Sequence, residues 1–237
     1  MGFTLQHWCL WQSQAGLHPH PWSGGVVLPC HDGTADVSFL PMMQSRRLSP
    51  LARAASAVAW HCRQTCGDMA SVFYSNHGES LYYFEMLQGL AAGEELSPSR
   101  FSLSVHNAIA GLSSFHSQSY LPYVSLAGGT EGVFAAFLEA DGLIRISPKV
   151  MLVCYEQVLP EAYRPYHASP DITWAFAMVL SRSADHGQQL RFLRRPNPWQ
   201  DEVDDAGYGL LQSMLQGVRS SVCVTGHALW QWSLDDA

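Results

Sequence analysis

Val105–Ala140 reads VHNAIAGLSSFHSQSYLPYVSLAGGTEGVFAAFLEA, and this stretch combines three local patterns. A segment of small residues is followed by a run with strand composition, Leu121–Leu126, and by the glycine turn AGGT at 127–130. The apolar segment Glu131–Ala140 then has helix composition. A strand, a glycine-rich elbow and a helix commonly present a catalytic nucleophile at a helix N-terminus, where backbone N–H groups favour an anion. The exposed elbow positions in this chain carry no nucleophile of the expected kind.

The composition of the 237-residue chain excludes several classes of protein. Charged residues make up only 14%, against about 25% in typical soluble domains. This favours either a large permanent subunit interface or a deeply buried core. The net charge is −7 without a basic stripe, which argues against a nucleic-acid partner. No apolar run of about 18 residues and no basic segment before such a run is present, so we expect neither a membrane span nor a signal peptide.

Other parts of the chain predict a central sheet with buried strands. The nearly continuous apolar runs Val150–Tyr155 and Ile172–Leu180 are typical of strands buried on both faces, and we expect the second to pair with Gln189–Leu193. Ala35–Phe39 alternates apolar and polar residues like a short strand. Asp141-Gly142 indicates a turn.

Two segments predict helices that pack closely. Ser49-Pro50 is a strong start signal, with serine as N-cap and proline at the first helical position. In Glu79–Leu90 the apolar residues nearly encircle the expected helix, so it must be buried within the domain or against a partner. Strands that alternate with buried helices predict a layered α/β/α fold. No linker divides the chain, so residues 1–237 are expected to form a single domain.

Two further groups of residues permit other chemistry. Cys154, Cys223 or the pair His77 and Ser80 would serve a self-standing acyltransferase or hydrolase. His61, Cys62 and Cys66 would serve a metal-binding module, but a zinc site needs about four convergent ligands and His61 lies off the helix face that the cysteines share. We therefore expect no metal, and interpret the scattered cysteines as buried small apolar side chains.

Three motifs, in order, resemble the N-terminal half of β-ketoacyl synthases, the condensing enzymes of the thiolase fold. They are Tyr74-Ser75-Asn76-His77-Gly78-Glu79, the segment SPSRFSLSVHNAIAG at 97–111, and the strand, elbow and helix at 123–136. The resemblance covers roughly Phe3–Gln157 and implies a thiolase-like fold. On this basis residues 1–157 form a synthase-like half, and residues 158–237 form a divergent, shortened or rebuilt part.

The chain departs from the family at the residues that perform its chemistry. The family elbow reads roughly Thr-Ala-Cys-Ser, and the matching cysteine position is Gly128. Glycine cannot replace the thiolate that accepts the acyl group. The family also uses two histidines, or a histidine and an asparagine, in its C-terminal half. His167, His186 and His227 do not lie in segments that match those motifs.

The resemblance therefore implies a non-catalytic subunit, a chain length factor like those of aryl polyene and type II polyketide pathways. Such a subunit pairs with an active β-ketoacyl synthase and shapes its acyl tunnel, and the chain being extended arrives on an acyl carrier protein. It implies no cofactor and a cytoplasmic location. The predicted tunnel-lining residues are Tyr82, Tyr83 and Met86. The predicted interface residues are Arg100, Ser104, His106, Asn107, Tyr123, Val124, Ser125 and Leu126.

Overall fold

The computed structural model of the chain describes residues 1–14, 20–166, 171–182, 187–197, 205–226 and 228–236. The strands are β1 (Gly2–Gln12), β2 (Gly25–Val27), β3 (Ala70–Tyr74), β4 (Tyr123–Leu126), β5 (Lys149–Glu156), β6 (Trp174–Ser181), β7 (Gln188–Pro196), β8 (Ser220–Val224) and β9 (Ala228–Asp235). The helices are α1 (Met42–Ser45), α2 (Pro50–Cys66), α3 (Ser80–Ala91), α4 (Pro98–Ser104), α5 (Ala108–Ser117), α6 (Val133–Leu143) and α7 (Ala206–Gln216), with the 3-10 helices η1 (Gly129–Glu131) and η2 (Glu161–Tyr166).

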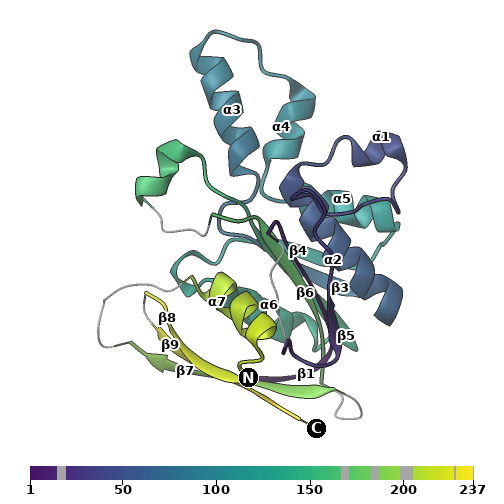
Figure 1. The fold of residues 1–237 in the computed structure, drawn as a ribbon, viewed down its shortest axis with the longest axis vertical. Helices are drawn as coiled ribbons and strands as arrows, with labels where there is room; N and C mark the ends of the chain where they lie inside the picture. Colours follow the sequence, from purple (N-terminus) through teal and green to yellow (C-terminus); the bar gives the residue numbers. More distant parts are fainter. Residues whose placement is uncertain (15–19, 167–170, 183–186, 198–204, 227, 237) are drawn as a thin grey trace.

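All of the strands belong to one nine-stranded mixed sheet (Figure 1). Its order is β4-β3-β5-β6-β1-β7-β9-β8, and β2 pairs in parallel with β1. The strands β4, β3 and β5 are parallel to one another, whereas the pairs from β5 to β8 are antiparallel. The strands β4 and β8 form the two ends of the sheet, so each has one edge without a paired strand in the described part of the chain.

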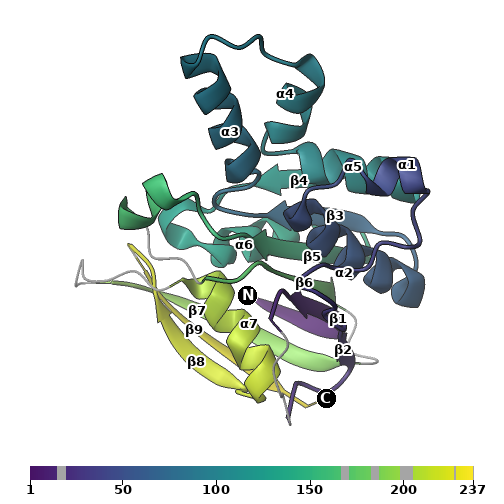
Figure 2. The ribbon, with the colours of Figure 1, turned by 45° about the horizontal axis from the view of Figure 1, so that its top comes forward.

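Helices cover both faces of the sheet, as the sequence predicts (Figure 2). The helices α2 and α5 share one buried core with the sheet, and α6 and α7 share the other. Residues of β6 alternate between these two cores. Trp174 and Phe176 point into the core shared with α6 and α7, whereas Ala175 and Ala177 point into the core shared with α2 and α5. Small residues on β6 meet an alanine-rich face of α2, which allows the helix to lie close to the sheet.

The helix α2 begins where the sequence predicts. The side chain of Ser49 accepts a hydrogen bond of 2.8 Å from the backbone N–H of Ala52, and Pro50 occupies the first helical position. The helix ends at Gly67, which adopts a φ of +79° that suits glycine. These start and stop signals are local, which explains why the sequence alone suffices to locate them.

Three local predictions are wrong. Gln188–Pro196 pairs with β1 and β9 rather than with β6, because β1 lies between β6 and β7 in the sheet. The pattern of apolar residues along a strand does not specify which strand lies beside it. Residues 35–39 form no strand. Asp141 and Gly142 belong to α6 rather than to a turn. The Asp141 carboxylate forms ion pairs with Arg145, one helical turn on, and with Arg182, which supports continuation of the helix.

The helices α3 and α4 form a hairpin that projects from the layered body (Figures 1 and 2). It packs on itself through α3 and α4, and α4 also contacts α5. The ring of Phe84 on α3 also lies 5.2 Å from the ring of Tyr163 on η2. The hairpin is thus an arm mounted on the sheet rather than a covering layer.

Candidate functional site

The glycine elbow between β4 and α6 has no room for a side chain at Gly128. Its backbone is in an ordinary helical conformation, with φ −84° and ψ −8°. A Cβ atom at this position would lie 2.0 Å from the carbonyl oxygen of Gly132 and 2.9 Å from Cε2 of Tyr74. Gly132 itself has φ +57° and ψ −144°, a conformation that other residues rarely adopt. The elbow is therefore closed to any side chain at Gly128, the position that the resemblance predicts to correspond to the nucleophile.

The C-terminal strands hold the elbow through Glu131, which ends η1. One carboxyl oxygen of Glu131 accepts a 2.8 Å hydrogen bond from the indole N–H of Trp230 on β9. The other forms a 3.0 Å ion pair with Arg194 on β7, whose guanidinium lies 5.9 Å from the centre of the Trp230 ring. Phe134 on α6 stacks on Trp230 with ring centroids 4.7 Å apart. The last third of the chain thus contributes directly to the shape of the elbow.

Replacing Glu131 with alanine is expected to lower the free energy of unfolding by about 1–3 kcal/mol, because the Trp230 indole N–H is buried and would lose its acceptor. The Arg194 ion pair adds little, since it is half exposed. Urea denaturation measures the effect. Glu139→Ala, on the neighbouring helix α6, is the control. A double-mutant cycle with Trp230→Phe isolates the contact, and additive effects would contradict this account.

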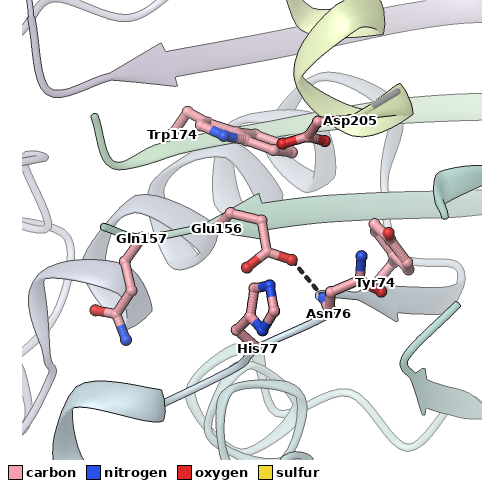
Figure 3. Close-up of a pocket in the computed structure, with 7 residues that line it drawn as sticks. All are labelled: Tyr74, Asn76, His77, Glu156, Gln157, Trp174 and Asp205. Carbon is pink, nitrogen blue, oxygen red and sulfur yellow. Dashed lines mark hydrogen bonds between the residues drawn. The ribbon is translucent and has the colours of Figure 1, made fainter. Parts of the chain in front are cut away.

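A small polar pocket lies beside the elbow, at the carboxyl ends of β3 and β5 (Figure 3). It is lined by Tyr74, Asn76, His77, Glu156, Gln157, Trp174 and Asp205. The carboxyl group of Glu156 points between the ring of His77 and the backbone of Asn76, whose N–H donates to it. Burial raises the pKa of Glu156 to about 8, although hydrogen bonds from the Asn76 backbone and others oppose the shift. Burial likewise raises the pKa of Tyr74.

The predicted tunnel-lining residues lie together on α3. Met86 is buried, Tyr82 is half-buried and Tyr83 is 48% exposed. Met86 is the only buried residue of the helix, so the structure excludes burial of α3 within this chain, and burial against a partner stays a prediction. We call the exposed apolar side chains of the hairpin the hairpin surface; they are Leu81, Tyr83, Leu87, Leu90, Leu96 and Phe101.

The predicted interface residues fall into two groups. On β4 and the start of α5, the Ser125 hydroxyl donates a 3.3 Å hydrogen bond to the carbonyl of His106, and exposed Asn107 follows directly as the N-cap residue of α5. On α4, Arg100 forms a 2.8 Å ion pair with Glu85 of α3 instead of standing free. The half-buried Ser104 donates a 2.9 Å bond back to the Phe101 carbonyl within α4. The remaining residues of β4 are half-buried, apart from exposed Tyr123.

A group of exposed apolar side chains lies on α5, in the segment that follows it and at the start of β4. We call it the edge surface; it comprises Phe115, Tyr120, Leu121 and Tyr123. Tyr120 is 98% exposed and Phe115 is 69% exposed. Apolar groups this exposed commonly mark contact with another protein. The edge surface and the free edge of β4 adjoin each other along the chain.

The other candidate nucleophiles lie in unsuitable surroundings. Cys154 is fully buried, and burial raises its thiol pKa well above the ordinary value, which disfavours the reactive thiolate. Cys223 is also buried. The Ser80 hydroxyl has no hydrogen-bond partner among the described residues, so it forms no serine–histidine pair with His77 there. The histidines at 167, 186 and 227 lie outside the described residues.

The metal-binding alternative also lacks a suitable geometry. His61 stacks on His7 with ring centroids 5.4 Å apart, while the Cys62 thiol is buried and points toward the carbonyl of Ala177 at 3.9 Å. In the described part of the chain, no three or more His, Cys, Asp or Glu side chains gather closely enough to hold a metal ion.

None of the described helices is both long enough and apolar enough to span a membrane.

Sequence analysis did not identify Glu131, Arg194, Trp230 or Glu156. The signal for Glu156 is a carboxylate at the carboxyl end of a strand buried on both faces, and binding sites commonly form at that end of a sheet. The contacts of Glu131 with β7 and β9 span 63 and 99 residues. No local pattern in the sequence encodes them.

The sequence matches the family model for the β-ketoacyl synthase, N-terminal domain, over residues 9–233. The chain therefore belongs to this family. The match continues past Gln157, where the resemblance read from the motifs ends. A comparison with curated proteins gives no match.

Solved structures confirm the predicted thiolase-like fold, and one of them is similar to this chain over most of its length. A chain of the ketosynthase (ApeO) in complex with its chain length factor (ApeC), from Xenorhabdus doucetiae, is 26% identical with a TM-score of 0.71, and the match covers 84% of this chain and 83% of that one. A β-ketoacyl synthase from Burkholderia phymatum STM815 is 13% identical with a TM-score of 0.54, and the match covers 69% of this chain but 51% of that one. The first relative therefore has nearly the length of this chain, and the second is longer.

Proposed function

We propose that this chain is a non-catalytic chain length factor that pairs with an active β-ketoacyl-acyl carrier protein synthase and shapes its acyl tunnel, in the synthesis of polyene, polyketide or fatty-acid-like chains. The observation that supports this most is Gly128. A synthase fold whose nucleophile position holds glycine, and whose backbone closes over the space a side chain needs, cannot form an acyl-enzyme there.

The comparisons support the proposal in two ways. The relative with a TM-score of 0.71 is described as a ketosynthase in complex with its chain length factor. The matched chain in that complex is about as long as this one, whereas the Burkholderia synthase is longer than either. The fold that this chain shares with a chain of that complex, over most of both lengths, fits a subunit of such a pair.

Pairing with the synthase would use the two apolar surfaces described above. The free edge of β4 would add to the sheet of the partner by backbone hydrogen bonds, as an edge strand readily does. Binding of the partner would also bury the edge surface and the hairpin surface. Burial of these side chains would supply most of the association free energy, at about 25 cal/mol per Å².

In the assembled pair, α3 would reach the acyl tunnel of the partner, with Tyr82, Tyr83 and Met86 along its wall. Aromatic side chains at the tunnel floor would stop elongation by steric overlap. Admitting one more two-carbon unit would displace packed atoms, at a cost of about 1–3 kcal/mol. Met86 is more adaptable and would act as a softer stop. The acyl carrier protein would deliver the growing chain to the synthase, and this subunit would hold no covalent intermediate.

Replacing Tyr82 or Met86 with alanine is expected to shift the products toward longer chains, by one or more two-carbon units, because the side chain that blocks the tunnel becomes shorter. Mass spectrometry of the products released by the intact complex measures the distribution. Leu138→Ala is the control, since Leu138 is exposed on α6 and should leave the length unchanged. An unchanged product length in a complex of normal size would remove this assignment for the residue tested.

The proposal as a whole is tested by co-expression with candidate synthases. The expected result is one complex of two different chains on size-exclusion chromatography. A cysteine-reactive acyl analogue should then label the synthase but not this chain. Labelling of this chain at Cys154 or Cys223, or turnover by the purified chain alone, would instead favour the self-standing acyltransferase or hydrolase. A chain that remains separate from every synthase tested would count against the pairing.

A further inference from the structure

The hairpin α3–α4 is joined to β3 by one short loop, residues 75–79. The loop begins at the end of β3, where the Ser75 N–H donates a 3.3 Å hydrogen bond to the carbonyl of Leu126 on the neighbouring strand β4. It then turns at Gly78, whose φ is +51° and whose N–H donates 2.7 Å to the Ser75 hydroxyl. A Cβ at Gly78 would lie 3.1 Å from Nδ1 of His106. The path of this loop therefore determines where α3 begins.

From one side, the end of β5 holds this loop. The Asn76 N–H donates to the carboxyl group of Glu156, and the Gln157 side-chain amide donates 3.1 Å to the carbonyl of Gly78. Glu156 is 7% exposed and Gln157 is 3% exposed. Figure 3 shows both side chains reaching from the strand toward the loop. The strand β5 is buried throughout apart from its first residue, so these anchors rest on a rigid element.

From the other side, Glu79 joins the loop to α2. The Ser49 hydroxyl donates a 2.6 Å hydrogen bond to Glu79, and the same hydroxyl oxygen accepts the N-cap bond from Ala52. Glu79 is 5% exposed, and its second carboxyl oxygen has no hydrogen-bond partner among the described residues. The base of the hairpin is thus held between the end of β5 and the start of α2, with one carboxyl group at each contact.

We propose that Glu79 and Glu156 are positioning residues that together fix the height and tilt of the α3–α4 hairpin on the sheet. Neither residue touches the elbow nucleophile position, and both act through the loop 75–79. The consequence for product length rests on the proposed function, since a hairpin that moves would also move Tyr82 and Met86. The anchoring itself does not depend on that function.

The charge state of the two carboxyl groups decides how firmly they hold. Burial raises the pKa of Glu79 to about 7 and that of Glu156 to about 8. Neither forms an ion pair with any of the described residues. Glu156 faces the groups of Tyr74, Ser75, Asn76, His77, Cys154, Tyr155 and Asp205. Glu79 faces the groups of Ser49, Tyr82 and Tyr155.

The sign of the pH dependence follows from these surroundings. A carboxyl group whose pKa is higher in the folded protein than in the unfolded chain stabilises the fold in its neutral form. Its contribution is complete below its ordinary pKa of about 4.5 and is lost as the pH rises to the folded value. Between about pH 5 and pH 8, the anchors therefore weaken, because a buried carboxylate without a cation is better solvated when the base of the hairpin opens.

Hydrogen exchange of the purified full chain tests the anchoring, with rates corrected for the intrinsic effect of pH. Protection of the amides at 80–104 is expected to fall by about tenfold or more between pH 6 and pH 9, because one pKa unit corresponds to a factor of ten in the equilibrium. In Glu79→Gln/Glu156→Gln, which keeps the acceptor oxygens but cannot ionise, protection should stay constant. Glu139→Gln should behave like the wild type. A wild-type hairpin without pH dependence, or a double variant that retains it, would overturn the proposal.

A second variant separates anchoring from the proposed function. Glu156→Ala removes the acceptor and should loosen the hairpin at every pH, and Glu156→Gln should restore it. If exchange responds to these variants while product length does not, anchoring stands and α3 is not the tunnel wall. If Tyr82→Ala lengthens the product while exchange ignores Glu79 and Glu156, the tunnel role stands and the anchoring is wrong.

Discussion

A Gly128→Cys variant is expected to unfold at a lower temperature than the wild type and to gain no acyl-transfer activity. The added Cβ would meet the carbonyl group of Gly132, a backbone atom that cannot rotate away as a side chain does. Overpacking of this kind costs about 1–3 kcal/mol when side chains adjust. Each kcal/mol lowers the melting temperature of a chain of this size by about 2–4 °C. A cysteine at this position would therefore distort the elbow.

Differential scanning fluorimetry and a thiol-labelling assay measure the two outcomes. Gly142→Cys is the matched control, because a Cβ there meets no atom within 4 Å. This variant should melt close to the wild type. A Gly128→Cys chain with wild-type stability and a thiol that an acyl donor modifies would show that the elbow opens easily. The proposed loss of the catalytic role would then rest on the sequence of the elbow and not on its shape.

A Tyr123→Pro variant is expected to lose association with the partner synthase, by on the order of 100-fold or about 2.7 kcal/mol. The backbone N–H of Ser71 donates to the carbonyl of Pro122, and the backbone N–H of Ser75 donates to that of Leu126, so these two carbonyls face β3. Alternate residues of a strand face the same neighbour, so the N–H of Tyr123 points to the free edge of β4. Proline removes this donor, yet it is tolerated at sheet edges, where the bonds to β3 are preserved.

Co-purification with the tagged synthase measures the loss of association. Tyr123→Ala is the control, since it removes the exposed phenol but keeps the N–H, and it should weaken binding much less than proline does. The melting temperature of each variant shows whether the fold survives. A folded Tyr123→Pro chain that co-purifies like the wild type would move the subunit contact away from β4, and the hairpin surface would become the next candidate.

Much of the fold follows from local signals in the sequence. Ser49 and Pro50 locate the start of α2, and the nearly continuous apolar runs locate β5 and β6, because burial on both faces leaves no polar position in the pattern. The elbow is recognisable from its glycines, although the helix after it begins at Val133 rather than at Glu131. The family could also be predicted from the sequence, since three motifs in the correct order are more specific than any one of them.

The remaining features depend on contacts between distant residues. The place of β7 beside β1 and β9 has no local signal, because alternation shows only which face a residue takes. Apolar residues all around α3 predict burial but do not say what covers it. Glu79 and Glu156 have no distinctive pattern in the sequence. Their proposed shared role is visible only in the structure, where the loop 75–79 packs between the end of β5 and the start of α2.

The exposed side chains of the hairpin and of the β4 edge also bear on how the subunit is produced. Under the pairing proposed above, a newly made copy that has not yet bound a synthase exposes Phe101, Phe115 and Tyr120 to the cell. Surfaces of this kind promote aggregation and attract chaperones and proteases. The steady-state amount of this subunit should therefore follow the amount of synthase available to cover it, so that unpaired copies are removed and the two chains accumulate in equal numbers.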